Sequence, residues 1–213
     1  MRRVVVTGLG LVTPLGGDVE TTWQNLIAGK SGIAPITRFD TSDQKAKIAG
    51  EVKPKDHPYG FDPDKRVDHK VQRQVDPFIV YAIDAAGQAL EDAGLAEMDD
   101  DLKERAGVSI GSGIGGLPGI ESESLVLAEK GPGRVSPHFV HGRLINLTSG
   151  QVSIKYGLMG PNHSVVTACR QKPGLRRARP GPSATSRTCG RLRKRAQAPR
   201  RSIRQLPRSS AEF

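Results

Sequence analysis

Residues 163–169 read HSVVTAC, and this stretch decides how the chain is interpreted. Its β-branched run is typical of a buried strand that would deliver Cys169 at its carboxyl end, the edge where open α/β sheets place reactive groups. A helix following the strand would lower the pKa of the thiol and make Cys169 a nucleophile for thioesters. Most free cysteines are small buried hydrophobic residues, so chemistry alone leaves both interpretations open.

The histidines offer the cysteine no partner that can be identified from spacing. His163 shares the strand face with Cys169, but six residues of extended chain separate them by roughly 20 Å. His138 and His141 lie in a loop without the further ligands that a metal site needs, so we interpret them as surface or packing residues. The sequence predicts neither a metal nor another cofactor.

Working outward, the preceding residues predict an α/β fold. Val4 to Thr7 is typical of a buried strand, and a helix from Asp18 to Gly29 would lay the apolar stripe Val19 to Ile27 on it. Asp76 as N-cap and Pro77 at the first helical position predict a well-buried helix that ends near Gly94.

Shorter elements complete the prediction. Residues 40–76 are expected to be irregular, with one short strand at 47–52. A second short apolar run at 107–110 enters a glycine-rich turn, and a helix is expected over 144–158, ending at Gly160 and Pro161.

GSGIGG at 111–116 satisfies the pattern G-x-G-x-x-G of dinucleotide-binding loops. The pattern requires a helix directly after the last glycine and an acid at the end of a later strand. Leu117, Pro118 and Gly119 follow instead, and Glu129 lies in no visible strand. We therefore interpret the motif as a plain glycine-rich turn.

The charge of the chain is unevenly distributed. Residues 170–213 hold 14 of the 32 lysines and arginines but only one of the 22 acids, which gives this segment a net charge of +13. Residues 1–169 have a net charge of −3, so the net charge of the whole chain is +10. No stretch reaches the roughly 18 apolar residues that span a bilayer, and no cleavage site follows the N-terminal apolar run. We expect a cytoplasmic protein in a reduced compartment, with no membrane association.

Six blocks, in order and spacing, resemble the elongating β-ketoacyl-acyl-carrier-protein synthases of the second type, over residues 1–169. They are VVVTGLGLVTPLG from Val4, WQNLIAGKSGI from Trp23, QRQVDPFIVYAIDAA from Gln72, GSGIGGL from Gly111, LINLTSGQVSIKYGLMGPNH from Leu144 and VVTAC from Val165. The resemblance implies a thiolase-like layered α/β sandwich, of which residues 1–169 would be part of the first half only.

The resemblance also implies roles for individual residues. Cys169 would accept the acyl group from acyl carrier protein before decarboxylative condensation with malonyl-carrier protein. Ile114 and Phe139 match positions that border the acyl pocket, Phe139 from the neighbouring subunit of a homodimer. Lys70 and Arg73 match positions that dock the acidic carrier protein. Where His138 and His141 stand, the family has phenylalanine and proline.

The resemblance stops after Cys169, where Arg170 to Gly174 replace the small residues that begin the nucleophile helix. Pro173 disfavours a helix there. The remainder, 170–213, is rich in arginine and proline, and we expect it to be disordered. We interpret it as the product of a reading-frame change that leaves the chain truncated and inactive. The alternative is a basic nucleic-acid-binding arm, which the scarcity of aromatic residues that could stack on bases disfavours.

Overall fold

The computed structural model describes residues 4–166 of the 213. The predicted nucleophile Cys169 and the basic segment 170–213, predicted to be disordered, lie outside the described residues. The elements follow in this order: α1 (Val19–Ile27), β1 (Ile33–Pro35), β2 (Ile48–Gly50), η1 (Pro63–Lys65), α2 (His69–Gln74), α3 (Pro77–Asp92), α4 (Asp100–Arg105), β3 (Val108–Ser109), α5 (Leu117–Lys130), η2 (Pro132–Arg134), α6 (Phe139–Arg143), α7 (Asn146–Tyr156) and β4 (Asn162–His163).

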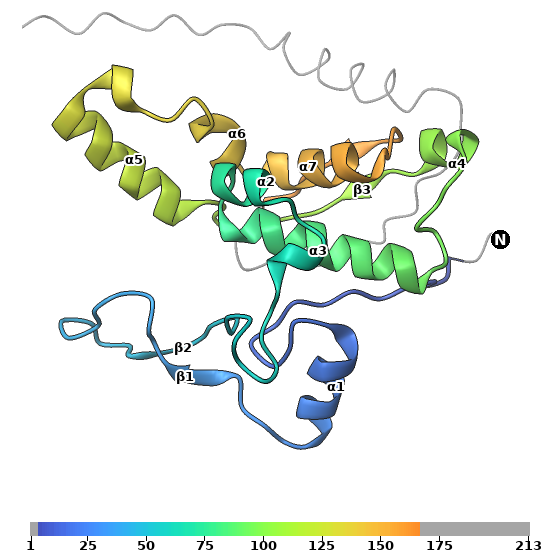
Figure 1. Cartoon of the computed structure of the whole chain (residues 1–213), viewed down its shortest axis with the longest axis horizontal. Helices are drawn as coiled ribbons and strands as arrows, with labels where there is room; N and C mark the ends of the chain where they lie inside the picture. Colours follow the sequence, from blue (N-terminus) through green and yellow to red (C-terminus); the bar gives the residue numbers. More distant parts are fainter. Residues whose placement is uncertain (1–3, 167–213) are drawn as a thin grey trace, which may run out of the picture. The chain divides into compact units, whose positions relative to one another are not determined.

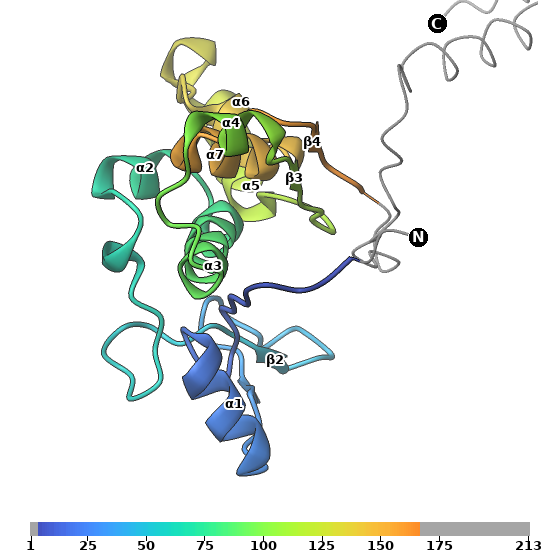
Figure 2. The ribbon, with the colours of Figure 1, turned by 90° about the vertical axis from the view of Figure 1, so that its right-hand side faces the viewer.

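Helix α3 is the centre of the core, as its apolar stripe predicts. In two views it lies between the α1, β1 and β2 segment and the group formed by α5, α6 and α7 (Figures 1 and 2). Ile79 and Ile83 are 0% and 2% exposed, and Val152 of α7 packs in the same cluster. The helix ends before Gly94, whose φ of +68° suits glycine. The predicted buried helix is confirmed.

The predicted buried strand at Val4 to Thr7 is wrong. These residues are in no strand, and Val4, Val5 and Val6 are 62% to 71% exposed. A strand needs a neighbour for its backbone hydrogen bonds, and within residues 4–166 no other strand pairs with this segment.

The helix predicted from Asp18 is confirmed, but the face it was expected to bury is not. Asp18 caps α1, its Oδ1 accepting from the Thr21 N–H at 2.7 Å. Trp23, Leu26 and Ile27 are more than half exposed, whereas Thr22 and Asn25 are buried. The Asn25 side-chain amide donates to the Leu15 carbonyl at 2.6 Å, so polar contacts with the preceding loop orient the helix.

The region 40–76 is less irregular than predicted. The expected strand forms as β2 and pairs antiparallel with β1, with Ala34 opposite Ala49. The sequence pattern did not indicate η1 or α2. Asp62 and Asp68 begin these two elements by accepting backbone N–H bonds, the role that N-cap aspartates commonly take.

The helix predicted over 144–158 is confirmed as α7, which ends at Gly157 in the left-handed region. The strand predicted from His163 to Ala168 is shorter in the described residues. β4 covers Asn162–His163 only, and Ser164 to Val166 are in no strand. None of the helices over residues 4–166 has the length and apolar character to cross a bilayer.

Candidate active site

β3 and β4 form a parallel pair that defines the candidate site. Val108 lies opposite Asn162, and Ser109 lies opposite His163. The Val108 N–H donates to the Pro161 carbonyl at 2.9 Å, and the Ile110 N–H donates to the His163 carbonyl at 3.1 Å. Because the strands are parallel, their carboxyl ends share one edge, where the glycine-rich turn leaves β3 and the segment toward Cys169 leaves β4.

The turn after β3 presents Ile114 to solvent. Its side chain is 67% exposed. The Gly115 N–H donates to Ser112 Oγ at 3.2 Å, and Gly115 has a φ of +86°, a conformation that favours glycine. Ile114 is therefore an accessible apolar side chain at the edge that β3 and β4 share.

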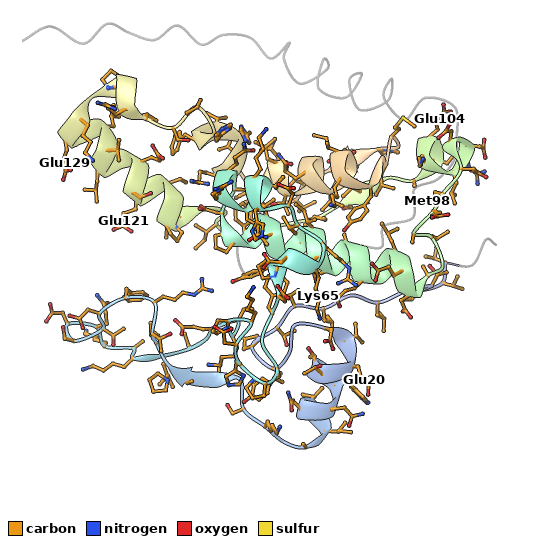
Figure 3. All side chains as sticks on the ribbon, in the orientation of Figure 1. Glu20, Lys65, Met98, Glu104, Glu121 and Glu129 are labelled. Atoms are coloured by element: carbon orange, nitrogen blue, oxygen red, sulfur yellow. The ribbon has the colours of Figure 1, made fainter. Side chains whose placement is uncertain are left out.

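The expectation that no helix follows this turn is wrong. α5 begins at Leu117, directly after the last glycine. Pro118 is tolerated there because the N–H groups of the first helical turn have no hydrogen-bond partner within the helix, so the N–H that proline lacks is not needed. Glu129 lies within α5 and in no strand, as expected. Glu121 and Glu129 point outward from this helix (Figure 3).

Phe139 is half-buried at the first position of α6. The rings of His138 and His141 beside it pack edge to face, with centroids 4.9 Å apart. Within residues 4–166, no group of three or more histidine, cysteine or carboxylate side chains is placed to hold a metal ion.

Arg143, the last residue of α6, connects three segments that are distant in sequence. Its Nη1 lies 3.3 Å from Asp76 Oδ1 and donates to the Gln74 carbonyl at 3.3 Å, and its own carbonyl accepts from the Gly116 N–H at 3.0 Å. The Asp76 N–H donates to the Gly142 carbonyl at 3.0 Å. We call this meeting of residues 74–76, 115–119 and 142–143 the Arg143 junction.

Glycines make the Arg143 junction possible. A Cβ on Gly116 would lie 2.0 Å from Asp76 Oδ2, and a Cβ on Gly119 would lie 1.9 Å from Arg143 Nε. A Cβ on Gly142 would lie 2.1 Å from the Gln74 carbonyl oxygen. Any side chain at these positions would separate the three segments.

The ion pair of the Arg143 junction is nearly buried, with side-chain exposures of 13% for Arg143 and 10% for Asp76. Burial raises the pKa of the Asp76 carboxyl, and the opposing effects of the Arg143 cation and the Gly119 N–H are smaller. Asp76 is the N-cap residue of α3, as predicted, but its side chain makes no capping bond. No local pattern indicates Arg143 as the partner of Asp76, because the two residues lie 67 positions apart in the sequence.

Lys70 and Arg73 lie three residues apart on α2, and both are exposed. Asp68 begins this helix by accepting the Lys70 N–H at 2.6 Å. The two cations are thus held near each other on one helix, available to a partner from outside.

A cavity of about 600 Å³ lies elsewhere, between the end of β2 and α3. Apolar side chains such as Phe61, Val75 and Val80 line it together with Arg38 and Glu51. No residue of 107–119 or 139–166 contributes to its lining. It is therefore separate from the β3–β4 edge.

Comparison with known proteins agrees with this architecture. Residues 1–170 match the family model "Beta-ketoacyl synthase, N-terminal domain". The chain is 52% identical over 168 residues to the 3-oxoacyl-[acyl-carrier-protein] synthase 2 of Coxiella burnetii, and 52% identical over 170 residues to that of Rhizobium meliloti. These matches cover 79% of this chain and 39% to 40% of the relatives, so the chain spans about two fifths of their length.

Solved structures show the fold. The ishigamide ketosynthase/chain length factor has a TM-score of 0.65 and 31% identity, over 78% of this chain and 40% of that one. A β-ketoacyl synthase from Burkholderia phymatum has a TM-score of 0.57 at 23% identity, over 79% of this chain and 40% of that one. The predicted thiolase-like α/β fold, present in part, is confirmed.

Proposed function

Because the chain belongs to the β-ketoacyl synthase family, we propose that residues 1–169 form the acyl-accepting part of a 3-oxoacyl-[acyl-carrier-protein] synthase, with Cys169 as nucleophile. The observation that carries the proposal is the family match, which runs through Cys169 to residue 170. The parallel pairing of β3 and β4 supports it. That pairing directs Ile114 and the segment toward Cys169 to the same edge.

The proposed first step is acyl transfer from acyl carrier protein. The Cys169 thiolate attacks the thioester carbonyl, a bond forms between Sγ and the carbonyl carbon, and the bond from that carbon to the carrier's sulfur breaks. The leaving thiolate takes up the proton that Cys169 released. In the family reaction of fatty-acid elongation, the acyl group then condenses with malonyl-carrier protein as carbon dioxide leaves.

For this chain, we confine the proposal to the acyl-transfer step. The family resemblance assigns decarboxylation to two histidines beyond the nucleophile, and the last histidine of the sequence is His163. Arg170 to Gly174 also replace the residues that begin the nucleophile helix in the family, and Pro173 disfavours a helix at this position, so we expect the Cys169 thiolate to be less favoured than in the family. For residues 1–213 alone, we expect acyl transfer to be slow and condensation not to be detected.

Acyl carrier protein is the proposed partner, and Lys70 and Arg73 are its proposed contacts. Exposed cations mainly raise the rate at which an acidic partner associates, and salt weakens that effect. Ile114 is the proposed border of the acyl pocket. Phe139 is proposed to reach the same pocket from the neighbouring subunit of a homodimer in the cytoplasm.

Residues 170–213 are proposed to be a separate segment that arose from a change of reading frame. The family match ends at residue 170, and the arginine, proline, alanine, glycine and serine of this segment have GC-rich codons. Reading the coding DNA in its other two frames after the Cys169 codon tests this. Absence of the family's nucleophile-helix sequence from both frames would contradict it.

The acyl-transfer proposal is tested by incubating the chain with medium-chain acyl carrier protein and measuring the intact mass. We expect one acyl adduct, mapped by peptide analysis to Cys169 and lost in Cys169→Ala. Cys189→Ala is the matched control, because it removes the other cysteine and keeps the nucleophile. An adduct that persists in Cys169→Ala, or no adduct on the parent chain, would contradict the proposal.

A further inference from the structure

Both proposed acyl-pocket residues are attached to the Arg143 junction. Ile114 directly precedes Gly115 and Gly116, and the Gly116 N–H donates to the Arg143 carbonyl. Phe139 begins α6, and Arg143 ends it about one helical turn further on. Any displacement of Arg143 would therefore move the Ile114 turn and Phe139 together.

The ion pair in this junction is poorly suited to a purely stabilising role. Asp76 Oδ2 and Arg143 Nε are buried, and neither makes a hydrogen bond to any part of the chain that the structure describes. Removing two charges from water is unfavourable, and incomplete hydrogen bonding leaves much of that cost unrecovered. Net stabilisation therefore does not account for this pair, and its contacts with the neighbouring segments become the observation to explain.

The surrounding contacts show which arrangement the pair fixes. Arg143 fills the space that Gly119 leaves open, so it sets how closely the start of α5 approaches α6. Asp76 Oδ2 occupies the space beside Gly116, so it sets how closely the turn approaches the start of α3. Gly115 packs against Ile145, where a Cβ would lie 2.8 Å from Cγ1. The turn that carries Ile114 is thus held from two sides.

We propose that Asp76 and Arg143 are positioning residues, which fix the Ile114 turn and Phe139 and thereby set the length of acyl chain that the site accepts. This inference rests on the proposed function, which assigns Ile114 to the acyl pocket of its own subunit and Phe139 to that of the neighbouring subunit. Neither Asp76 nor Arg143 contacts the reacting atoms. Their effect is on the shape of the pocket border.

The test compares the parent chain with the double variant Asp76→Asn/Arg143→Met. Replacing both partners leaves no unpaired buried charge, so the double variant is expected to retain its fold better than either single variant. The matched control is Asp101→Asn/Arg105→Met, which removes the exposed pair on α4, where the side chains are 78% and 72% exposed.

Two measurements are made on each protein. Hydrogen exchange at the Gly115, Gly116 and Gly119 amides reports whether the turn is held, and we expect about tenfold faster exchange in the double variant. The ratio of Cys169 acylation rates with short and long acyl carrier proteins reports the pocket border. We expect this ratio to change by about tenfold in favour of the longer chain.

The control variant is expected to match the parent in both measurements. If the double variant also matches the parent, the inference is wrong. A uniform loss of acylation with an unchanged ratio would indicate a merely structural role and would also contradict it. If the parent takes up no acyl group, the proposed function fails, and exchange at the three glycines alone decides whether the pair positions the turn.

Discussion

Gly10 lies against Ala85 of α3 so closely that a Cβ on Gly10 would be 1.8 Å from the Ala85 carbonyl oxygen. A Cβ on Gly8 would likewise be 2.1 Å from the Ala89 carbonyl oxygen. Between these contacts, the Leu9 N–H donates to Asp92 Oδ2 at 2.8 Å, and the Leu11 N–H donates to Gln88 Oε1 at 3.2 Å. The small residues of both segments therefore allow an extended chain to be hydrogen-bonded along the central helix.

Gly10→Ala is expected to destabilise the chain by about 1 to 3 kcal/mol, because the added methyl group has to displace the helix or the segment. Urea unfolding measures the difference. Gly133→Ala is the matched control, since no atom lies within 4 Å of a Cβ at that position. An equal unfolding midpoint for the two variants would show that the segment does not pack on α3.

Tyr156 is expected to make stability fall in alkaline solution. Burial raises the pKa of its phenol from 10.0 to about 12, and its hydroxyl donates to the Ile83 carbonyl at 2.8 Å. Between these pH values the unfolded chain loses a proton that the folded chain retains, so the free energy of unfolding decreases as pH rises. Below pH 10 the contribution is fully present.

Denaturant titrations at several pH values, compared with Tyr156→Phe, check this. The variant is expected to be about 1 kcal/mol less stable at neutral pH. Its free energy of unfolding should decrease much less between pH 10 and 12 than that of the parent chain. In Tyr59→Phe, the control, the free energy of unfolding is expected to decrease with pH as much as in the parent chain. If the free energy of unfolding decreases by the same amount in Tyr156→Phe as in the parent chain, another titrating group is responsible.

Lys70→Glu and Arg73→Glu are expected to slow acyl transfer from acyl carrier protein, each by roughly threefold to tenfold at low ionic strength. The difference from the parent should shrink as salt is added, because exposed charges are screened. Rates of Cys169 acylation across a salt series measure it. Lys130→Glu at the end of α5 makes the same charge change away from α2. Equal slowing by this control would remove the proposed docking role.

The chain is expected to be poorly soluble on its own. Val4, Val5, Val6, Trp23 and Leu26 are all more than half exposed, and an extended apolar segment favours association with other chains. Val5→Lys is expected to raise the soluble fraction after centrifugation, whereas Glu129→Lys is not. A parent chain that remains soluble as a dimer and melts cooperatively would contradict this expectation.

Local sequence patterns predicted where the helices begin and end better than they predicted which segments the helices pack against. Asp18 and Gly29 indicated α1, and Pro77 and Gly94 indicated α3, because caps and breakers act within a few residues. The face that α1 buries could not be predicted. Its orientation is set by Asn25 bonding to Leu15, a contact that hydrophobic periodicity does not encode.

The candidate site shows the same division. The sequence placed Ile114 in a glycine-rich turn after a strand, and the structure agrees. It did not indicate that α5 begins at Leu117, because proline and glycine there look like breakers. The Asp-Pro pair correctly indicated Asp76 as the N-cap residue of α3. Local pattern could not indicate that the Asp76 side chain pairs with Arg143, because Arg143 comes from a distant segment.

The parallel pairing of β3 with β4 also bears on the order in which the chain folds. Val108 and Asn162 meet only after a loop of 54 residues has closed, at an entropic cost of about 3.5 kcal/mol before any strand contact forms. The helices within that loop form from local contacts and shorten the effective distance. The edge on which the proposed chemistry depends is therefore built by a non-local contact, which forms more slowly than the local contacts within the helices.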